Sequence, residues 1–187
     1  KPGDPAFVAD DYKLIATPRA ALDAAAATAR DAGYEIIDLG DSLEGETQDV
    51  ARDHAALARQ YLRDNKRVAI LSGGETTVTI RGDGRGGPNA EYILTLTTEL
   101  KGEPGISAIA CDTDGVDGSE DNAGAMTFSD TLARATANGL QADAFLANND
   151  SWGFFKALDD LVICGPTQTN VNDFRAILVD PKIAAQP

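Results

Sequence analysis

The sequence predicts an α/β fold, with a layered, mostly parallel or mixed sheet and flanking helices. Two observations support this prediction. Apolar runs typical of buried strands alternate with amphipathic helical segments along the 187 residues. In addition, residues 12–40 resemble a strand, a helix and a strand in succession, which is the unit of a parallel sheet. A content of 43% hydrophobic and 25% charged residues is sufficient for a folded core.

The first helix is expected within residues 17–33, between strands at residues 12–17 and 34–40. Thr17 is a suitable N-cap, and Pro18 suits the first helical position. Gly33 suits the left-handed residue that ends a helix.

A second helix is expected within residues 44–67. Val50, His54, Leu57 and Tyr61 recur on one face of it at helical spacing. His54 is the only histidine of the chain. Its position on this face predicts a packed or half-buried residue, and we assign it no catalytic role.

The second half of the chain is expected to contribute most of the sheet. Residues 67–71 are continuously apolar, as in a strand covered on both faces. Residues 76–80 alternate between apolar and polar types and predict a half-exposed strand. The remaining expected elements are helices within 88–100, 129–139 and 150–160, and strands within 105–115, 161–170 and 174–180.

The charge and the cysteines restrict the classes of function. The formal net charge of −14 opposes binding to nucleic acid or to an anionic membrane. With no apolar run of about 18 residues and no visible signal peptide, a cytoplasmic protein is expected. Cys111 and Cys164 each lie in an apolar run, which favours buried reduced thiols over a disulfide or a metal pair.

The segment 82–87 fits the letters G-x-G-x-x-G of a dinucleotide-binding turn. An expected strand precedes it, a helix follows it, and Asp112 comes about 25 residues later, where a ribose-binding acid would be. The alternating strand and Pro88 at the helix start oppose this interpretation. A Walker A loop is excluded, because no Gly-Lys-Ser/Thr follows.

The same loop is also suited to holding an anion. Arg85 supplies a fixed charge, and the following helix start has N–H groups near Asn89 and Ala90. Together they predict a clamp for phosphate or carboxylate. A flexible connection with one solvated arginine is the alternative.

Three further polar loops follow expected apolar strands, and the first is Ser72-Gly73-Gly74-Glu75 after residues 67–71. In "DTDGVDG", Asp112, Asp114 and Asp117 suggest Mg²⁺, although Val116 excludes an EF-hand and an acidic surface turn is equally compatible. The segment "GPTQTNVND" carries Thr167, Thr169, Asn170, Asn172 and Asp173. Ligands of open α/β sheets lie at the carboxyl ends of strands, so these loops together predict a site.

Four segments resemble one known family: "LSGGETTVTIRGDGRGGPNAE", "DTDGVDGSEDNAGA", "NNDSWGFF" and "GPTQTNVND". They resemble the C-terminal MOFRL domain of the class II glycerate kinases, whose members often carry the name hydroxypyruvate reductase. The resemblance spans about residues 67–180, and residues 13–65 resemble, less distinctively, the end of the family's Rossmann-like kinase domain. It implies a remnant of that domain at 1–66 and a MOFRL domain at 67–187.

The resemblance implies transfer of the ATP γ-phosphate to the 2-hydroxyl of glycerate, with Mg²⁺ or another divalent cation, in a cleft between two domains. The family's catalytic lysine lies upstream of this segment, so the chain is expected to be a C-terminal piece that is inactive without its N-terminal domain. Two positions depart from the family pattern: Pro88 replaces an arginine of many members, and Gln168 replaces a glycine.

The expected roles follow from motif and resemblance together. Arg85 is the expected catalytic residue, and Asp114 and Asp117 are the expected metal ligands. An NAD(P)H-dependent hydroxypyruvate reductase and a non-catalytic regulatory or dimerising domain remain alternatives, and a homodimer remains open. The residues expected to contact substrate or phosphate are Ser72, Gly73, Gly74, Glu75, Gly86, Gly87, Asn89, Glu91, Thr113, Thr167, Thr169, Asn170 and Asn172.

Overall fold

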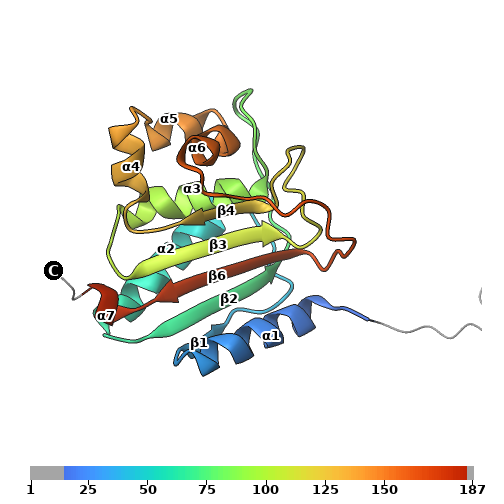
Figure 1. Ribbon diagram of the computed structural model, residues 1–187, viewed down its shortest axis with the longest axis vertical. Helices are drawn as coiled ribbons and strands as arrows, with labels where there is room; N and C mark the ends of the chain where they lie inside the picture. The colour runs from blue at the N-terminus through green and yellow to red at the C-terminus, as the bar shows by residue number, and fades with distance from the viewer. Residues whose placement is uncertain (1–14, 185–187) are drawn as a thin grey trace, which may run out of the picture.

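A computed structural model describes residues 15–184 as a six-stranded mixed sheet between layers of helices (Figure 1). The strand order is β1-β2-β6-β3-β4-β5. β1 pairs with β2 in parallel, and every other pairing is antiparallel. The strands are β1 (Glu35–Asp38), β2 (Val68–Gly74), β3 (Ile106–Asp112), β4 (Gly124–Thr127), β5 (Leu161–Val162) and β6 (Asp173–Val179). This agrees with the predicted α/β class.

The helices cover both faces of the sheet. On one face, α1 packs Leu22 and Ala26 against Leu71 of β2. On the other face, α2 and α3 form the main core with β2, β3 and β6, and α4 to α6 pack beside α3 (Figure 1). The helices are α1 (Pro18–Asp31), α2 (Thr47–Arg63), α3 (Pro88–Leu100), α4 (Thr131–Ala137), α5 (Ala142–Ala147), α6 (Ser151–Leu158) and α7 (Pro181–Ala184).

The predicted capping of the first helix is confirmed. The Thr17 hydroxyl accepts a hydrogen bond from the Ala20 amide at 3.0 Å, and Pro18 occupies the first turn. Gly33 has a φ of 85°, in the left-handed region. His54 is also as predicted, because it is buried on α2 and its Nδ1 lies 2.8 Å from the Tyr92 hydroxyl.

Several predicted elements differ in the structure. Residues 76–80 form no strand, and only an isolated bridge joins Thr77 to Glu46. The strand expected within 161–170 is limited to β5, because the chain then leaves the sheet. Of the strand expected at 12–17, residues 12–14 lie outside the described part, and residues 15–17 form no strand. β4, α5 and α7 had no counterpart among the sequence predictions.

The two cysteines are free thiols in different surroundings. Cys111 is partly buried, and burial raises its pKa to about 11. Cys164 is exposed, which corrects the expectation of a buried side chain. Among residues 15–184, no helix combines the length and the apolar character needed to cross a bilayer.

Candidate active site

The pairing of β6 brings the three motif loops to one edge of the sheet. Asp173 begins β6, and it stands opposite Gly74 at the end of β2 and opposite Asp112 at the end of β3. Because β6 is antiparallel to both neighbours, its start and their ends meet at the same edge (Figure 1). The loop before β6 therefore lies beside the loops that follow β2 and β3.

The first turn of α3 is occupied by a carboxylate of the chain itself. Asp117 is 1% exposed, and its Oδ1 accepts the Asn89 amide at 2.9 Å while its Oδ2 accepts the Ala90 amide at 2.8 Å. The N–H groups expected to be free for a substrate anion are thus already bound. Burial raises the pKa of Asp117 to about 6, although these donors oppose the rise.

A glycine is required where Asp117 meets the helix. A Cβ on Gly87 would lie closer to Oδ1 of Asp117 than van der Waals contact allows. Gly87 is the N-cap of α3 and has an extended φ of −125°, so the requirement is for space and not for unusual backbone angles.

The glycine loop packs against the turn before α6. Oδ1 of Asn149 accepts the amides of Arg81 at 2.7 Å and Gly82 at 3.0 Å, and the Gly84 amide donates to the Asn148 carbonyl at 2.9 Å. These contacts anchor the loop, in contrast to the flexible connection considered from the sequence. Because residues 76–80 are not a strand, the strand-turn-helix context of a dinucleotide turn is also missing.

Arg85 lies on the surface of this loop with its charge already paired. Its Nη2 contacts the carboxylate of Glu120, and its guanidinium carbon lies 3.8 Å from the centre of the Trp152 ring. The hydrogen bond from Arg85 lowers the pKa of Glu120. Arg85 is therefore held by a carboxylate and an aromatic face, partners that a bound anion would have to replace or join.

The loops after β3 and before β6 are joined by hydrogen bonds. The Thr113 hydroxyl donates to the Asn172 carbonyl at 2.8 Å, and the Thr167 hydroxyl donates to the Thr113 carbonyl at 2.5 Å. Thr169 and Asn170 are exposed beside this junction. An open hollow of about 400 Å³ lies there, lined by Asp114, Val116, Pro166, Gln168, Thr169 and Asn170.

Of the two predicted metal ligands, Asp117 does not fit direct coordination of Mg²⁺ as it stands, and Asp114 has one of its two oxygens engaged by a backbone N–H. Both oxygens of Asp117 accept backbone N–H groups, and Oδ1 of Asp114 accepts the Val116 amide at 2.8 Å. Throughout residues 15–184, no three His, Cys, Asp or Glu side chains are grouped as metal ligands would be. The carboxylates therefore stabilise the loop in this structure.

The other predicted site residues divide by exposure. Glu75, Arg85, Thr167, Thr169 and Asn170 are exposed at the sheet edge and accessible to a ligand. Gly86, Thr113, Asp114 and Asn172 are half-buried. The buried ones form the frame below: Ser72, Gly73, Gly74, Gly87, Asn89, Glu91 and Asp117.

Glu91 illustrates this frame. It is 2% exposed, and its carboxylate accepts hydrogen bonds from Gln48 and Asn149, each at 2.9 Å. It therefore connects α2, α3 and the turn before α6, and does not face the surface. Sequence reasoning assigned no role to Asn149, which also holds the glycine loop.

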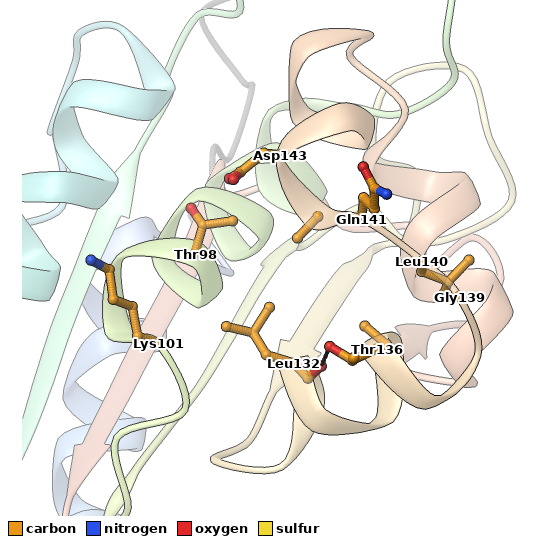
Figure 2. Close-up of a pocket in the computed structure, with 10 residues that line it drawn as sticks. Thr98, Lys101, Leu132, Thr136, Gly139, Leu140, Gln141 and Asp143 are labelled. Carbon is orange, nitrogen blue, oxygen red and sulfur yellow. Dashed lines mark hydrogen bonds between the residues drawn. The ribbon is translucent and has the colours of Figure 1, made fainter.

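A larger hollow of about 580 Å³ lies elsewhere, between the last turn of α3, α4 and the start of α5 (Figure 2). Lys101 and Thr98 border it on one side, and Leu132 and Thr136 border it on the other. Because it borders the last turn of the 13-residue α3, this hollow lies roughly 15 Å from the first turn of the helix. It is not part of the loop cluster.

The fold and the loop cluster define a mixed α/β domain with a polar site at one sheet edge, and comparisons with known proteins identify its family. The profile of the MOFRL family matches residues 68–173, which is more than half of the chain. The chain belongs to the MOFRL family.

Relatives in this family carry two kinds of name. A protein of Agrobacterium vitis named "Putative hydroxypyruvate reductase" is 49% identical over 178 residues, covering 92% of this chain and 41% of the relative. D-glycerate 2-kinase of Thermotoga maritima is 34% identical over 167 residues, covering 87% of this chain and 40% of the relative. The chain thus spans about two fifths of the length of these relatives.

Solved structures agree with the fold. The crystal structure of glycerate kinase from Thermotoga maritima is similar with a TM-score of 0.86 and 33% identity, over 90% of this chain and 42% of that one. A protein from Pyrococcus horikoshii is similar with a TM-score of 0.84 and 31% identity, over 91% of this chain and 40% of that one. Both matches extend beyond residues 68–173 to nearly the whole chain.

Proposed function

We propose that this chain is the C-terminal part of a glycerate 2-kinase, which transfers the γ-phosphate of ATP to the 2-hydroxyl of glycerate. The observation that carries the proposal is the meeting of the three motif loops at one sheet edge, in a chain whose relatives include glycerate kinases. The MOFRL part would be residues 67–187, and residues 1–66 would belong to the preceding kinase domain.

Arg85 is the proposed contact for negative charge. Phosphoryl transfer depends mainly on positioning and on neutralising charge that spreads over the phosphate oxygens. The side chain of Arg85 is 56% exposed, and its guanidinium already binds a carboxylate, that of Glu120. A carboxylate of glycerate or a transferring phosphate would take the place of Glu120.

Exposed polar side chains of the loops at the same sheet edge would orient the substrates. Thr169 and Asn170 border the open hollow, Thr167 lies in the same loop, and Glu75 follows the end of β2 at the same edge. The hydroxyl and amide groups of Thr167, Thr169 and Asn170 bind hydroxyl and phosphate oxygens without adding negative charge, and the Glu75 carboxylate accepts hydrogen bonds from substrate hydroxyls. Because Asp114 and Asp117 are bound within the loop, we expect a divalent cation to enter as the complex with ATP.

The name hydroxypyruvate reductase, carried by relatives with 49% and 48% identity, keeps an NAD(P)H-dependent reductase as the second candidate. A non-catalytic regulatory or dimerising domain is the third, because the chain spans only part of its relatives.

One experiment separates these candidates. The longest natural protein that contains this sequence is given glycerate with Mg-ATP, and separately hydroxypyruvate with NADH. The same two assays are run on the 187-residue chain. The kinase proposal predicts ADP formation and no NADH loss in the longer protein, and no turnover by the chain alone. Reduction of hydroxypyruvate without ADP formation would overturn it.

A further inference from the structure

Arg175 is a buried cation to which the proposed reaction gives no role. It is 1% exposed in the middle of β6, on the face covered by α2 and α3. Its Nη2 contacts Asp173 and donates to the Thr76 hydroxyl at 3.2 Å, and its guanidinium carbon lies 5.5 Å from the ring centre of Tyr92. Its Nε and Nη1 have no hydrogen-bond partner among residues 15–184.

This arrangement is not one that maximises stability. Burying a charge is costly unless the pairing and the hydrogen bonds are complete. Here one carboxylate compensates the guanidinium, and two of its nitrogens are left without partners. The compensation given to Arg175 is partial, which favours a role in fixing its neighbours over a role in stabilising the core.

A short chain of contacts leads from Arg175 to the first turn of α3. Asp173 binds Arg175 through Oδ2 and accepts the side-chain amide of Asn89 through Oδ1 at 2.7 Å. The backbone amide of Asn89 in turn donates to Asp117 at 2.9 Å. Two carboxylates and one amide thus connect the guanidinium to the helix start.

The same contacts reach every loop of the candidate site. Thr76 lies in the loop after β2, Asp117 lies in the loop after β3, and Asp173 is the first residue of β6, directly after the loop before that strand. The Thr47 hydroxyl donates to the Thr76 hydroxyl at 2.9 Å, which adds the start of α2. One side chain, Arg175, is therefore joined to all of them within two or three contacts.

We propose that Arg175 is a positioning residue, which acts through Asp173 and Asn89 to fix the first turn of α3 and the three loops around it. It touches no ligand itself. Its catalytic consequence rests on the proposed kinase function, whereas its effect on the loops can be measured without any activity.

Amide hydrogen exchange of the chain tests the positioning role. In Arg175→Met, the amides of Asn89 and Ala90 are expected to exchange at least about tenfold faster, because the contacts that order the first turn are lost. The amides of Leu96 and Thr97, nearer the end of α3, are expected to stay within about threefold of the original rates. Equal acceleration along the whole helix, or no change at Asn89 and Ala90, would overturn the proposal.

Two further variants keep the test decisive if Arg175→Met fails to fold. Arg175→Lys retains a charge that can pair with Asp173, so it is expected to restore part of the protection at the helix start. Asp173→Asn removes that partner with little change of volume, and is expected to loosen the same amides as Arg175→Met. Protection as low in the lysine variant as in the methionine variant would contradict a role through charge.

The matched control is Arg134, which pairs with Asp160 at 2.6 Å and donates to the Leu158 carbonyl at 3.1 Å. It joins α4 to the end of α6, and none of its hydrogen bonds or ion pairs within residues 15–184 reaches α3 or the motif loops. Arg134→Met is expected to leave exchange at the first turn of α3 unchanged. Loosening there by both substitutions would show a general loss of stability and overturn the specific role.

Activity then tests the catalytic consequence. In the longer kinase, Arg175→Lys is expected to lower kcat at least about tenfold while KM for glycerate changes less than about threefold, because aligned groups act on the transition state. An unchanged kcat in an active enzyme would overturn this part. If the unaltered protein has no kinase activity, the proposed function fails, and the exchange measurements still decide the positioning role.

Discussion

At the scale of single residues, Arg85 has the partners expected of an anion contact. A carboxylate from the same chain and the face of Trp152 hold its guanidinium at the surface. In the longer kinase, Arg85→Ala is expected to lower kcat/KM for glycerate by about a hundredfold or more, if the guanidinium binds charge that develops during transfer. Steady-state kinetics measure the effect.

Arg81 supplies the matched control for this substitution. It is an exposed arginine of the same loop, and no ion pair is formed by its side chain within the described part of the chain. Arg81→Ala is expected to have a much smaller effect than Arg85→Ala. A loss below about threefold for Arg85→Ala would exclude the role of Arg85 in binding developing charge.

His54 predicts a pH dependence of stability. Burial lowers its pKa to about 4, with Arg175 adding to the effect, from an ordinary value of 6.5. The unfolded chain therefore binds more protons than the folded one between about pH 4 and 6.5, and folding loses stability as the pH falls through that range. The full effect at this shift is about 3 kcal/mol.

Other buried groups act in the opposite direction. The pKa of Asp117 is raised to about 6 by burial, so its protonation favours the folded state as the pH falls from 6 to 4. For this reason the contribution of His54 is isolated by comparing the free energy of unfolding of a variant with that of the original chain. The free energy of unfolding of His54→Gln, relative to the original chain, should rise by up to about 3 kcal/mol between pH 6.5 and 4. A difference independent of pH would show that His54 is not held neutral by burial.

At the scale of elements, α3 organises the site. Its first turn meets Asp117, and Gly87 leaves no room for a Cβ there. Gly87→Ala is expected to destabilise the fold by about 2–3 kcal/mol, because a buried carboxylate must move. Urea unfolding followed by circular dichroism measures the change.

Gly139 gives the comparison for this substitution. It has open space around its Cα and a φ of +72°. Gly139→Ala therefore carries only the cost of a left-handed residue, about 1 kcal/mol. Equal destabilisation by the two substitutions would contradict the steric role of Gly87.

The elements show which parts of the fold the sequence could predict. Local signals were sufficient for α3, where Pro88 marks the first turn and the structure gives Pro88–Leu100 within the predicted range. They were misleading at residues 76–80, where apolar and polar residues alternate as in a strand. In the structure, the Thr77 amide donates to Gly45 at 2.9 Å, and Ile80 is 80% exposed. Tertiary contacts that the alternation cannot encode decide this segment.

The candidate site was predictable in its loops but not in its connections. Motifs and strand ends placed the "SGGE", "DTDG" and "TNVND" loops together, and β6 joins them at one edge. The hydrogen bonds from the α3 amides to Asp117 join residues that are far apart in the sequence. Motif spacing alone could therefore not predict them. The burial of Arg175 could be predicted from the sequence. Alternate residues of β6 are buried, and Arg175 falls on the same face of the strand as Ile177 and Val179.

At the scale of the whole molecule, the first part of the chain and the MOFRL part share one core. The predicted boundary falls in the turn between α2 and β2, yet Ala51, Ala55 and Ala58 of α2 are buried in the same cluster as α3. β1 also pairs with β2 in the same sheet. Residues 67–187 alone are therefore expected to lose cooperative unfolding.

Urea titration of the full chain and of residues 67–187 checks this expectation. The shorter chain would expose the apolar surface of α3 and leave the β2 edge unpaired, so a broad transition or aggregation is expected. A sharp transition with a midpoint equal to that of the full chain would show that the MOFRL part folds on its own.

The stacking of Arg85 on Trp152 also makes the fluorescence of this tryptophan sensitive to the position of Arg85. Trp152 is the only tryptophan of the sequence, and its ring centre lies 3.8 Å from the guanidinium carbon of Arg85 and 4.1 Å from Nζ of Lys156. If an anion draws Arg85 away from Glu120, the indole loses one of its two cations and gains contact with water. Added glycerate should then shift the tryptophan emission to longer wavelength in the unlabelled protein, with no shift in Arg85→Ala.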